Sequence, residues 1–373
     1  MNLKPFKLER YFAKYEFSAK YMLSSSDCDG WAVKDILSLA DPETLKIWEE
    51  LRLGYTESLG LPMLRKEVSG LYKGISEEDV LIVVPEEGIF ITINVLLKKG
   101  DHIICTYPGY QSLYEIAESL GCEITKWLPE EEDNWRFDPA FLEKNIKKNT
   151  RLVIVNFPHN PTGSLASHKD FQKIIDIAKD NNIYLFSDEM YRFLEINLED
   201  RLPSACEVYD KAISLFGMSK TFGMAGVRLG WVATKNKELY KKIMTYKDYV
   251  TICPSAPSEI LSLIALKNKD IIINKHLERI RKNLKLLDIF FAKYSNLFSW
   301  IKPKAGTIGF PRLKTNINSL AFCQKIVEKT GIMLLPSTVY DFEDRYIRIG
   351  FGRENMPEVL KQFDNYISSN PIE

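Results

Sequence analysis

The sequence has no excess of charge of either sign and few residues of the kind that bind metals or form disulfide frameworks. Lys plus Arg and Asp plus Glu number 50 each, so no overall field directs the protein toward nucleic acid or an acidic membrane surface. The four histidines show no metal-ligand spacing, and the six cysteines never form a CxxC pair. We therefore expect no metal site, reduced core cysteines, and small molecules or further copies of the chain as partners.

Long hydrophobic runs and a secretory signal are also missing. No apolar run reaches the roughly 18 residues that suggest a membrane span. The start MNLKPFKLERYF has neither an apolar segment nor a small-residue cleavage site, which predicts a cytoplasmic protein with no membrane partner. No GxGxxG motif follows a predicted strand, which disfavours a nicotinamide enzyme.

The composition that is present is typical of a globular enzyme, with 45% hydrophobic and 27% charged residues in 373 positions. This length suits two domains, or one large domain with a satellite. From residue 80 onward, short β-rich runs alternate with amphipathic helices; the runs are VLIVV, HIICTY, EITKWL, RLVIVNF, NIYLFSDE and KAISLFGM. The alternation predicts an α/β fold with a largely parallel sheet covered on both faces.

The remaining segments predict a second, smaller unit. SEILSLIALKNK and NKHLERIRKNLKLLDIFFAKY are expected to form two helices, and short strands then alternate with helices to the end of the chain. We predict a large α/β domain over 48–275 and a small α+β domain made of 1–47 and 276–373. The N-terminal aromatic residues at helical spacing are expected to be core or subunit contacts that could also close over a site: Tyr11, Phe12, Tyr15 and Phe17.

The stretch SKTFGMAGVRLGW, residues 219–231, contains the lysine on which our interpretation depends. Lys220 ends an apolar run and has small and apolar neighbours, which desolvate an ammonium and lower its pKa. Such a lysine can form a Schiff base. Arg228 has the fork geometry that suits a phosphate, and lysine plus phosphate suggests pyridoxal phosphate. The alternative is a buried strand-turn-strand whose lysine head reaches water.

Polar residues also close the other predicted strands, at the edge where ligands bind in parallel sheets. Asp188 would be costly to bury alone, but a protonated pyridine nitrogen would compensate its charge. Its alternative role is a helix N-cap. Tyr191 and Asn160 are expected to reach the phenolic oxygen of the pyridine ring and stabilise its phenolate. Asn160 lies in HNPTG, which favours a turn whatever it binds, and Pro161 is a candidate for a cis peptide.

Further residues are candidates for stacking on the ring and for binding anions. Tyr110 in YPGYQSLY could stack on the pyridine, although tyrosines in such runs are more often core. Phosphate donors would be Arg228, the Ser219 hydroxyl, and the N-terminus of a helix expected over about 86–98.

Three arginines compete for the carboxylate of a substrate. Arg348 lies in the alternating strand RYIRIGFGR, where a half-buried guanidinium could bind an α-carboxylate with two nitrogens. Arg345 and Arg353 are the competing choices, and a solvated strand edge is the alternative to all three. Elsewhere, Tyr55 between two glycines suits a contact surface, with a plain loop as its alternative.

Taken together, these motifs resemble a fold-type I pyridoxal-phosphate (PLP) enzyme of the class I and II aminotransferases, in the aspartate-aminotransferase superfamily. The match runs in order over nearly the full length: Tyr55 with Gly60 and LR at 64–65, PGY at 108–110, NPTG at 160–163, DEMY at 188–191, SK with Arg228, and Arg348. The resemblance implies a three-layer PLP-transferase fold, with a mostly parallel sheet between helices, and a small α+β domain.

The resemblance also implies a role for each residue. Lys220 would carry the Schiff base and the proton, assisted by Asp188 and Tyr191, while Arg348 and Asn160 would bind substrate. Residues implied to bind the cofactor are Lys220, Asp188, Tyr191, Asn160, Tyr110, Ser219, Arg228 and the turn of Glu86, Glu87 and Gly88. Tyr55 would reach the phosphate in the neighbouring subunit, which implies a homodimer with shared active sites.

Two positions depart from the family pattern. A small Gly/Ser/Thr turn usually precedes the phosphate-binding helix, whereas this chain has VVPEEG. Pro85 has no amide hydrogen, and Glu86 and Glu87 must point away from a phosphate dianion. The serine often found three residues before the lysine is Gly217 here. We therefore expect the phosphate to be held less firmly, or by other residues.

The predicted function is a PLP-dependent aminotransferase that moves an amino group between an L-amino acid and a 2-oxo acid through a Schiff base on Lys220. The first alternative is a lyase, decarboxylase or cyclase of the same fold acting on a substituted amino acid. It is favoured by LERYFAKYEF and by the PEEG turn, which differ from common transaminases. A non-catalytic ligand-binding domain is disfavoured because every proposed catalytic position is filled.

Overall fold

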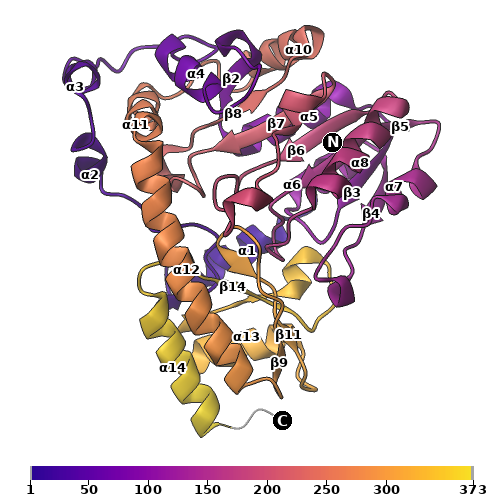
Figure 1. Ribbon diagram of the computed structural model, residues 1–373, viewed down its shortest axis with the longest axis vertical. Helices are drawn as coiled ribbons and strands as arrows, with labels where there is room; N and C mark the ends of the chain where they lie inside the picture. The colour runs from indigo at the N-terminus through magenta and orange to yellow at the C-terminus, as the bar shows by residue number, and fades with distance from the viewer. Residues whose placement is uncertain (1, 371–373) are drawn as a thin grey trace.

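The computed structural model describes residues 2–370 and is built around a seven-stranded sheet (Figure 1). The strand order is β2-β8-β7-β6-β5-β3-β4. Their bounds are β2 (Val80–Val83), β3 (His102–Thr106), β4 (Glu123–Trp127), β5 (Thr150–Asn156), β6 (Tyr184–Asp188), β7 (Ala212–Gly217) and β8 (Gly230–Ala233). All pairs are parallel except those of β8, which runs antiparallel to both neighbours. The predicted, mostly parallel sheet is confirmed, and β8 is a strand that the apolar runs did not predict.

Helices cover both faces of the sheet because its apolar residues alternate between two cores. The helices of the larger part are α4 (Pro62–Ser69), α5 (Pro85–Leu96), α6 (Ser112–Ser119), α7 (Ala140–Asn145), α8 (His168–Asp180), α9 (Ala205–Val208), α10 (Lys237–Lys247) and α11 (Ala256–Lys267). On one face Leu81 and Val83 of β2 pack in a cluster with residues of α5, α6 and α10. Val80 and Ile82 pack in a second cluster, with α4 and α11. The three-layer arrangement follows from this alternation.

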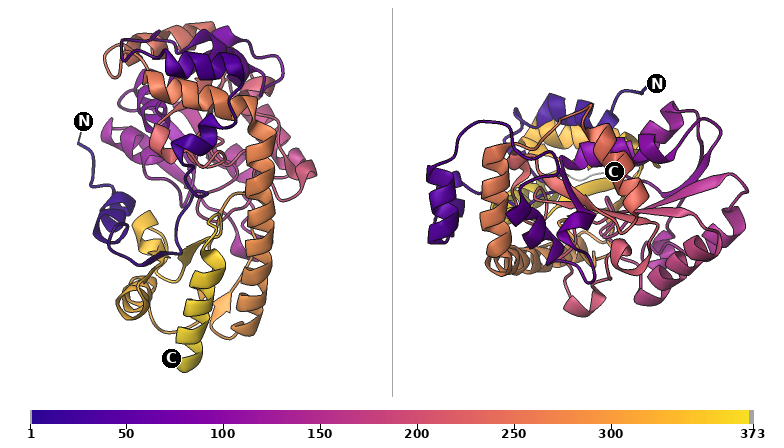
Figure 2. Two further views of the ribbon diagram at one scale, coloured as in Figure 1. Left: turned by 90° about the vertical axis from the view of Figure 1, so that its left-hand side faces the viewer. Right: turned by 90° about the horizontal axis from the view of Figure 1, so that it is seen from above.

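The C-terminal part is a smaller assembly of short strands and helices. It comprises α12 (Lys269–Lys293), β9 (Phe298–Ser299), β10 (Ile308–Gly309), β11 (Arg312–Leu313), α13 (Ser319–Thr330), β12 (Ile332–Met333), β13 (Leu335–Pro336), β14 (Ile347–Gly350) and α14 (Met356–Ser369). β10, β14 and β13 form an antiparallel sheet. The long α12 extends beside α14 in both orientations (Figures 1 and 2), and Phe290 stacks on Phe363 between them.

The N-terminal segment is divided between the two parts: its first half packs with the C-terminal part, and its second half packs against α11. It contains α1 (Lys7–Tyr15), β1 (Tyr21–Met22), α2 (Val33–Leu37) and α3 (Pro42–Glu49). β1 pairs in parallel with β12, Tyr21 opposite Ile332. At the other end of the segment, the Lys7 amide donates to Gln111 Oε1 at 3.0 Å, which ties α1 to the loop before α6. α1 is therefore fixed between the two parts of the molecule.

Several local expectations differ from the structure. The helix expected at 86–98 begins at Pro85 and ends at Leu96, because proline is tolerated in a first helical turn. WAVKDILSLAD forms only the five-residue α2. Of the N-terminal aromatic residues, Phe17 is 92% exposed and is therefore not in the core of this subunit.

Other expectations concern what the chain lacks. Within residues 2–370 all six cysteines are free, and five of them are buried. The same residues contain no cluster of His, Cys, Asp and Glu able to hold a metal. None of the helices described is both long enough and apolar enough to cross a bilayer.

Candidate active site

A cavity of about 400 Å³ opens at the carboxyl ends of β5, β6 and β7, between the sheet and the C-terminal part. Parallel strands bring their carboxyl ends to one edge, so residues distant in sequence meet there. Of the residues predicted from sequence, those lining the cavity are Glu86, Tyr110, Asn160, Asp188, Tyr191, Ser219, Lys220, Arg228 and Arg348. Most of the predicted constellation is thus brought together.

Lys220 lies just beyond the end of β7 and reaches into the cavity. Its Nζ donates a hydrogen bond to Ser26 Oγ at 2.8 Å. Burial lowers the pKa of the Lys220 ammonium, and the nearby Asp27 carboxylate partly opposes this shift. The direction is the one expected from the apolar neighbours, and it favours the neutral, nucleophilic amine.

Asp188 is the last residue of β6, paired in register with Asn156 of β5. Its side chain is buried, with 5% exposure, and Oδ1 accepts only the Met190 amide at 3.1 Å. Burial raises the pKa of Asp188 to about 7, and the charges of Glu189 and Glu86 contribute to the rise. Residues 190–193, directly after Asp188, form a turn and not a helix, so its alternative role as an N-cap is not found. A cation in the cavity would compensate this carboxylate.

Tyr191 and Asn160 line the same cavity, but the Tyr191 hydroxyl already donates a hydrogen bond, whereas the NH₂ group of Asn160 does not. The Tyr191 hydroxyl donates to the Ser26 carbonyl at 3.0 Å. The Asn160 amide oxygen accepts from Tyr340 Oη at 3.2 Å and from Arg348 at 3.4 Å, which leaves its NH₂ group for a ligand. The Asn160–Pro161 peptide is cis, as anticipated.

Arg348 is the buried member of the three candidate arginines, with 1% exposure. Nε and Nη2 donate to the Ser24 carbonyl at 3.2 and 2.9 Å, and Nη1 donates to Tyr340 Oη at 2.7 Å. Arg345 is exposed and does not line the cavity. Arg353 lines it but pairs with Asp27 at 3.2 Å. Arg348 is thus oriented toward the cavity by partners that leave its charge uncompensated.

The two glutamates of the PEEG turn behave differently. Glu87 turns away from the cavity, since Oε2 accepts the Val84 amide at 3.1 Å and Oε1 accepts from Thr251. Glu86 does not turn away, contrary to expectation: it lines the cavity and accepts a hydrogen bond from the Ser112 hydroxyl. Burial raises the pKa of Glu86, which favours the neutral acid beside a bound anion.

The two departures from the family pattern, Pro85 in the turn and Gly217 in β7, pack against each other. A Cβ added at Gly217 would lie 2.9 Å from Gly230 Cα and 3.1 Å from Pro85 Cγ, so the proline ring occupies the space of a side chain there. Gly88 is also explained by packing: a Cβ would lie 3.0 Å from both Leu215 Cδ1 and Val83 Cγ2. A side chain at position 217 would clash with the ring of Pro85, so the proline at 85 favours a glycine at 217.

The remaining predicted residues lie at the rim or outside. Tyr110 lines the cavity and packs against Phe6 with ring centroids 5.0 Å apart. Arg228 lines the cavity but is exposed, and Ser219 is buried beside it. Tyr55 is 91% exposed and does not contribute to the cavity of its own subunit.

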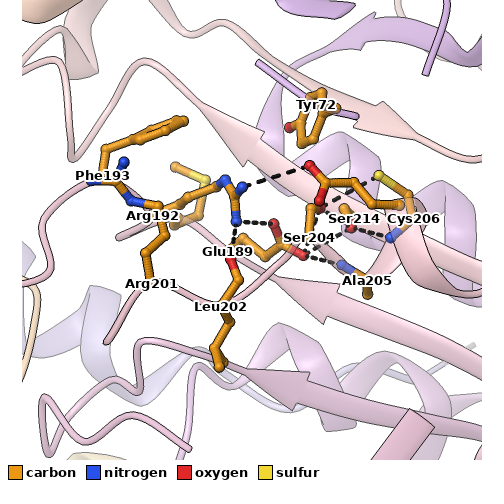
Figure 3. Close-up of polar contacts among 12 residues, drawn as sticks. Tyr72, Glu189, Arg192, Phe193, Arg201, Leu202, Ser204, Ala205, Cys206 and Ser214 are labelled. Atoms are coloured by element: carbon orange, nitrogen blue, oxygen red, sulfur yellow. Dashed lines mark hydrogen bonds and ion pairs between the residues drawn. The ribbon is translucent and has the colours of Figure 1, made fainter. Parts of the chain in front are cut away.

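The residue after Asp188 anchors the site loop in a buried polar network (Figure 3). Glu189 Oε1 accepts from Ser204 Oγ and the Ala205 amide at 3.0 Å and from Ser214 Oγ at 2.8 Å. Arg192 lies between Glu189 and Glu207, at 3.9 and 3.7 Å. This network holds the turn that carries Asp188 and Tyr191.

Sequence reasoning missed the residues that enter the cavity from the N-terminal segment. Ser26 and Asp27 come from SSSDCDG, which has the composition of any turn. Glu9 and Glu16 line the cavity from α1 and its C-terminal end. Phe12 was anticipated only as an aromatic residue that could close over a site. The amphipathic pattern of α1 predicts which side of the helix is apolar, but it does not predict which surface of the protein that side packs against.

The fold and the site define the class of this protein: a fold-type I pyridoxal-phosphate enzyme. The residues present fit that cofactor, because the buried Asp188 requires a cation and Lys220, Ser219 and Arg228 offer an amine and phosphate donors in the same cavity. The model of the family "Aminotransferase class I and II" matches residues 23–363, and the chain belongs to this family.

Similar proteins of known name include more than one activity. The chain is 29% identical over 323 residues to an aspartate aminotransferase of Pyrococcus horikoshii, covering 83% of this chain and 82% of that protein. It is 26% identical over 348 residues to capreomycidine synthase of Streptomyces vinaceus, covering 92% and 88%.

Similar solved structures also include both an aminotransferase and a cyclase. A PLP-dependent aminotransferase from Streptococcus suis superposes with a TM-score of 0.93 at 29% identity, covering 100% of both chains. The PLP-dependent cyclase OrfR superposes with a TM-score of 0.88 at 24% identity, covering 99% of this chain and 98% of that one, which shows the fold alone.

Proposed function

We propose that this protein is a PLP-dependent aminotransferase that moves an amino group between an L-amino acid and a 2-oxo acid. The observation that carries the proposal is one cavity that holds a desolvated lysine, a buried aspartate and a buried arginine: Lys220, Asp188 and Arg348. When bound, the cofactor supplies an electron sink for the electrons of the substrate's α-carbon. The catalytic residues are Lys220, Asp188 and Tyr191.

The chain's own residues would position the reactants and move the proton. Asp188 would face the ring nitrogen and keep it protonated, while Tyr110 would stack on the ring. The Asn160 NH₂ would donate to the phenolic oxygen, and the Tyr191 hydroxyl would do so in place of its bond to the Ser26 carbonyl. Phosphate would be held by Ser219, Arg228 and the amides of Glu86 and Glu87 at the N-terminus of α5, whereas the amide of Gly88, which was also predicted to bind it, already donates to the Val84 carbonyl at 2.9 Å.

Different residues of the cavity would bind the substrate and transfer the proton. Arg348 would bind the α-carboxylate, with Asn160 beside it. Lys220, as a neutral amine, would take the proton from the substrate's α-carbon, and Ser26 Oγ would orient the amine for that transfer. α1 lines the cavity through Leu8, Glu9 and Phe12 and would limit the access of water to these groups.

We also propose a homodimer with shared active sites. Tyr55 and Leu53 are 91% and 86% exposed, and Tyr249 is 88% exposed. The two segments are adjacent, because Thr56 Oγ1 donates to the Pro254 carbonyl at 3.0 Å. A second subunit covering this apolar surface would bring Tyr55 to the phosphate end of its neighbour's cavity.

A lyase, decarboxylase or cyclase of the same fold is the second candidate. Likeness to capreomycidine synthase favours it. Glu86, which lines the cavity where the family usually has a small residue, also favours it.

Product stoichiometry without an acceptor separates the two candidates. Holoenzyme incubated with a panel of amino acids is expected to release one equivalent of 2-oxo acid per subunit and then stop until a 2-oxo acid is added. Lys220→Ala should abolish the release. Continued turnover without an acceptor, with elimination, decarboxylation or cyclisation products, would instead establish the second candidate.

A further inference from the structure

The wall of the cavity opposite the sheet is formed by one face of α1. Glu9, Phe12 and Glu16 follow each other at spacings of three and four residues, so they share one side of the helix, and all three line the cavity. α1 is held in place, since the Lys7 amide bonds to Gln111 and the Lys7 ammonium pairs with Asp341. These side chains are therefore presented to the cavity by an anchored helix.

The charges at this end of the cavity do not balance. Asp27 is paired with Arg353 at 3.2 Å. The carboxylates of Glu9 and Glu16 have neither an ion pair nor a hydrogen-bond partner within residues 2–370. Burial raises the pKa of Glu16, the charges of Glu9 and Asp27 raise it further, and the charges of Arg353 and Lys220 partly oppose the rise. Carboxylates crowded in this way are relieved by a bound cation.

A second observation is a buried polar group in the cavity wall. Ser25 lines the cavity and is 6% exposed, and its hydroxyl has no hydrogen-bond partner among the residues that the structure describes. A buried hydroxyl without a partner costs free energy unless a ligand or water supplies one. An acidic substrate side chain would instead need a cation here, and Arg353 is already paired with Asp27.

We propose that the amino-acid substrate has a cationic side chain, an ammonium or a guanidinium, which Glu16 and Glu9 bind while Arg348 holds the α-carboxylate. The inference rests on the proposed function. Phe12 lies between the two ends, with its ring 5.8 Å from the Arg348 guanidinium carbon, and offers an apolar surface to the substrate's methylene groups. The chain thereby differs from relatives named for aspartate.

Binding to the holoenzyme tests the proposal directly. L-arginine, L-ornithine and L-lysine are compared with the neutral L-norleucine and the acidic L-glutamate and L-aspartate, and dissociation constants are measured by calorimetry and by the change in cofactor absorbance. At least one cationic amino acid is expected to bind roughly ten- to a hundredfold more tightly than norleucine, as hydrogen bonds between charged groups do. The arginine and ornithine arms distinguish a guanidinium from an ammonium.

Matched variants assign the preference to α1. Glu16→Gln and the double variant Glu9→Gln/Glu16→Gln should lose about tenfold or more in affinity for the cationic amino acid and leave norleucine binding unchanged. Glu238→Gln removes an exposed carboxylate that pairs with Lys242 on α10 and should change neither. Thermal unfolding of each variant verifies that the fold is kept.

The outcomes separate this proposal from the proposed function. The proposal is overturned if norleucine, glutamate or aspartate binds as tightly as every cationic amino acid, or if the double variant keeps the preference of the wild type. If a cationic amino acid binds selectively but transfers no amino group to a 2-oxo acid, the substrate class stands and the aminotransferase function fails.

Discussion

The buried carboxyl of Asp188 makes the stability of the protein depend on pH and on bound cofactor. Its carboxyl is buried with a single backbone hydrogen bond, and its pKa is raised to about 7. Between the usual aspartate pKa near 4 and pH 7, the folded protein without cofactor holds a proton that the unfolded chain has released. The stability of the cofactor-free protein therefore falls as pH rises through this window.

The pH dependence can be measured by thermal unfolding of cofactor-free protein from pH 4 to pH 8. Wild type should lose stability relative to Asp188→Asn, by an amount on the order of 4 kcal/mol at most. Cofactor should restore most of the loss, because a cationic ring nitrogen compensates the carboxylate. Parallel pH profiles for wild type and Asp188→Asn would contradict this account of the site.

Arg192 does not line the cavity but supports the turn that carries Asp188 and Tyr191. It lies between Glu189 and Glu207, and its removal leaves two buried carboxylates without their cation. We expect Arg192→Ala to lower the free energy of unfolding by about 3 kcal/mol, measured by denaturant titration. Arg136→Ala, which removes an exposed pair with Asp170, should cost less than about 1 kcal/mol. Equal losses for the two variants would show that the buried network is not structurally important.

At the scale of elements, α5 and the strands β7 and β8 are fitted to each other at Pro85, Gly217 and Gly230. Restoring the family's serine by Gly217→Ser should lower stability by about 1–3 kcal/mol, since its Cβ would overlap Gly230 Cα and Pro85 Cγ. Pro85→Ala in the same chain removes the ring atom from the clash and should recover part of the loss in denaturant titrations. A fully additive double variant would refute the coupling between the two positions.

How far sequence predicts each element depends on the kind of signal that the element carries. The six apolar runs predict six strands, and five of these, all except β4 at the edge of the sheet, are largely buried on both faces, as a continuous apolar run requires. β8 (GWVA) begins with a glycine and has only three apolar residues, so that pattern does not mark it; its antiparallel neighbours β2 and β7 hold it in the sheet. Lys220, Asp188 and Arg348 follow from strand ends and motifs. Ser26 and Glu16 do not, because their place in the cavity depends on long-range packing of a turn and a helix.

At the scale of the whole molecule, Tyr55 does not contribute to the cavity of its own subunit. It is 91% exposed here, and in the proposed dimer its hydroxyl would donate to the phosphate in the neighbouring cavity. Tyr55→Phe should therefore weaken cofactor binding about tenfold, measured by titration of the cofactor-free protein, and leave the mass of the dimer unchanged in ultracentrifugation. Tyr249→Phe is the control from the adjacent segment, which should bind cofactor as wild type does. Unaltered affinity in Tyr55→Phe would argue against a shared site.

The pairing of β1 with β12 also bears on how the protein is made. Residues 21–22 have their strand partner at 332–333, so the chain as far as residue 333 must leave the ribosome before this pair can form. The central sheet, with Asp188 and Lys220, is complete in sequence by residue 233. During synthesis the half of the cavity nearest the sheet can thus assemble early, whereas β1, which follows α1, can join the fold only after residue 333 has been made.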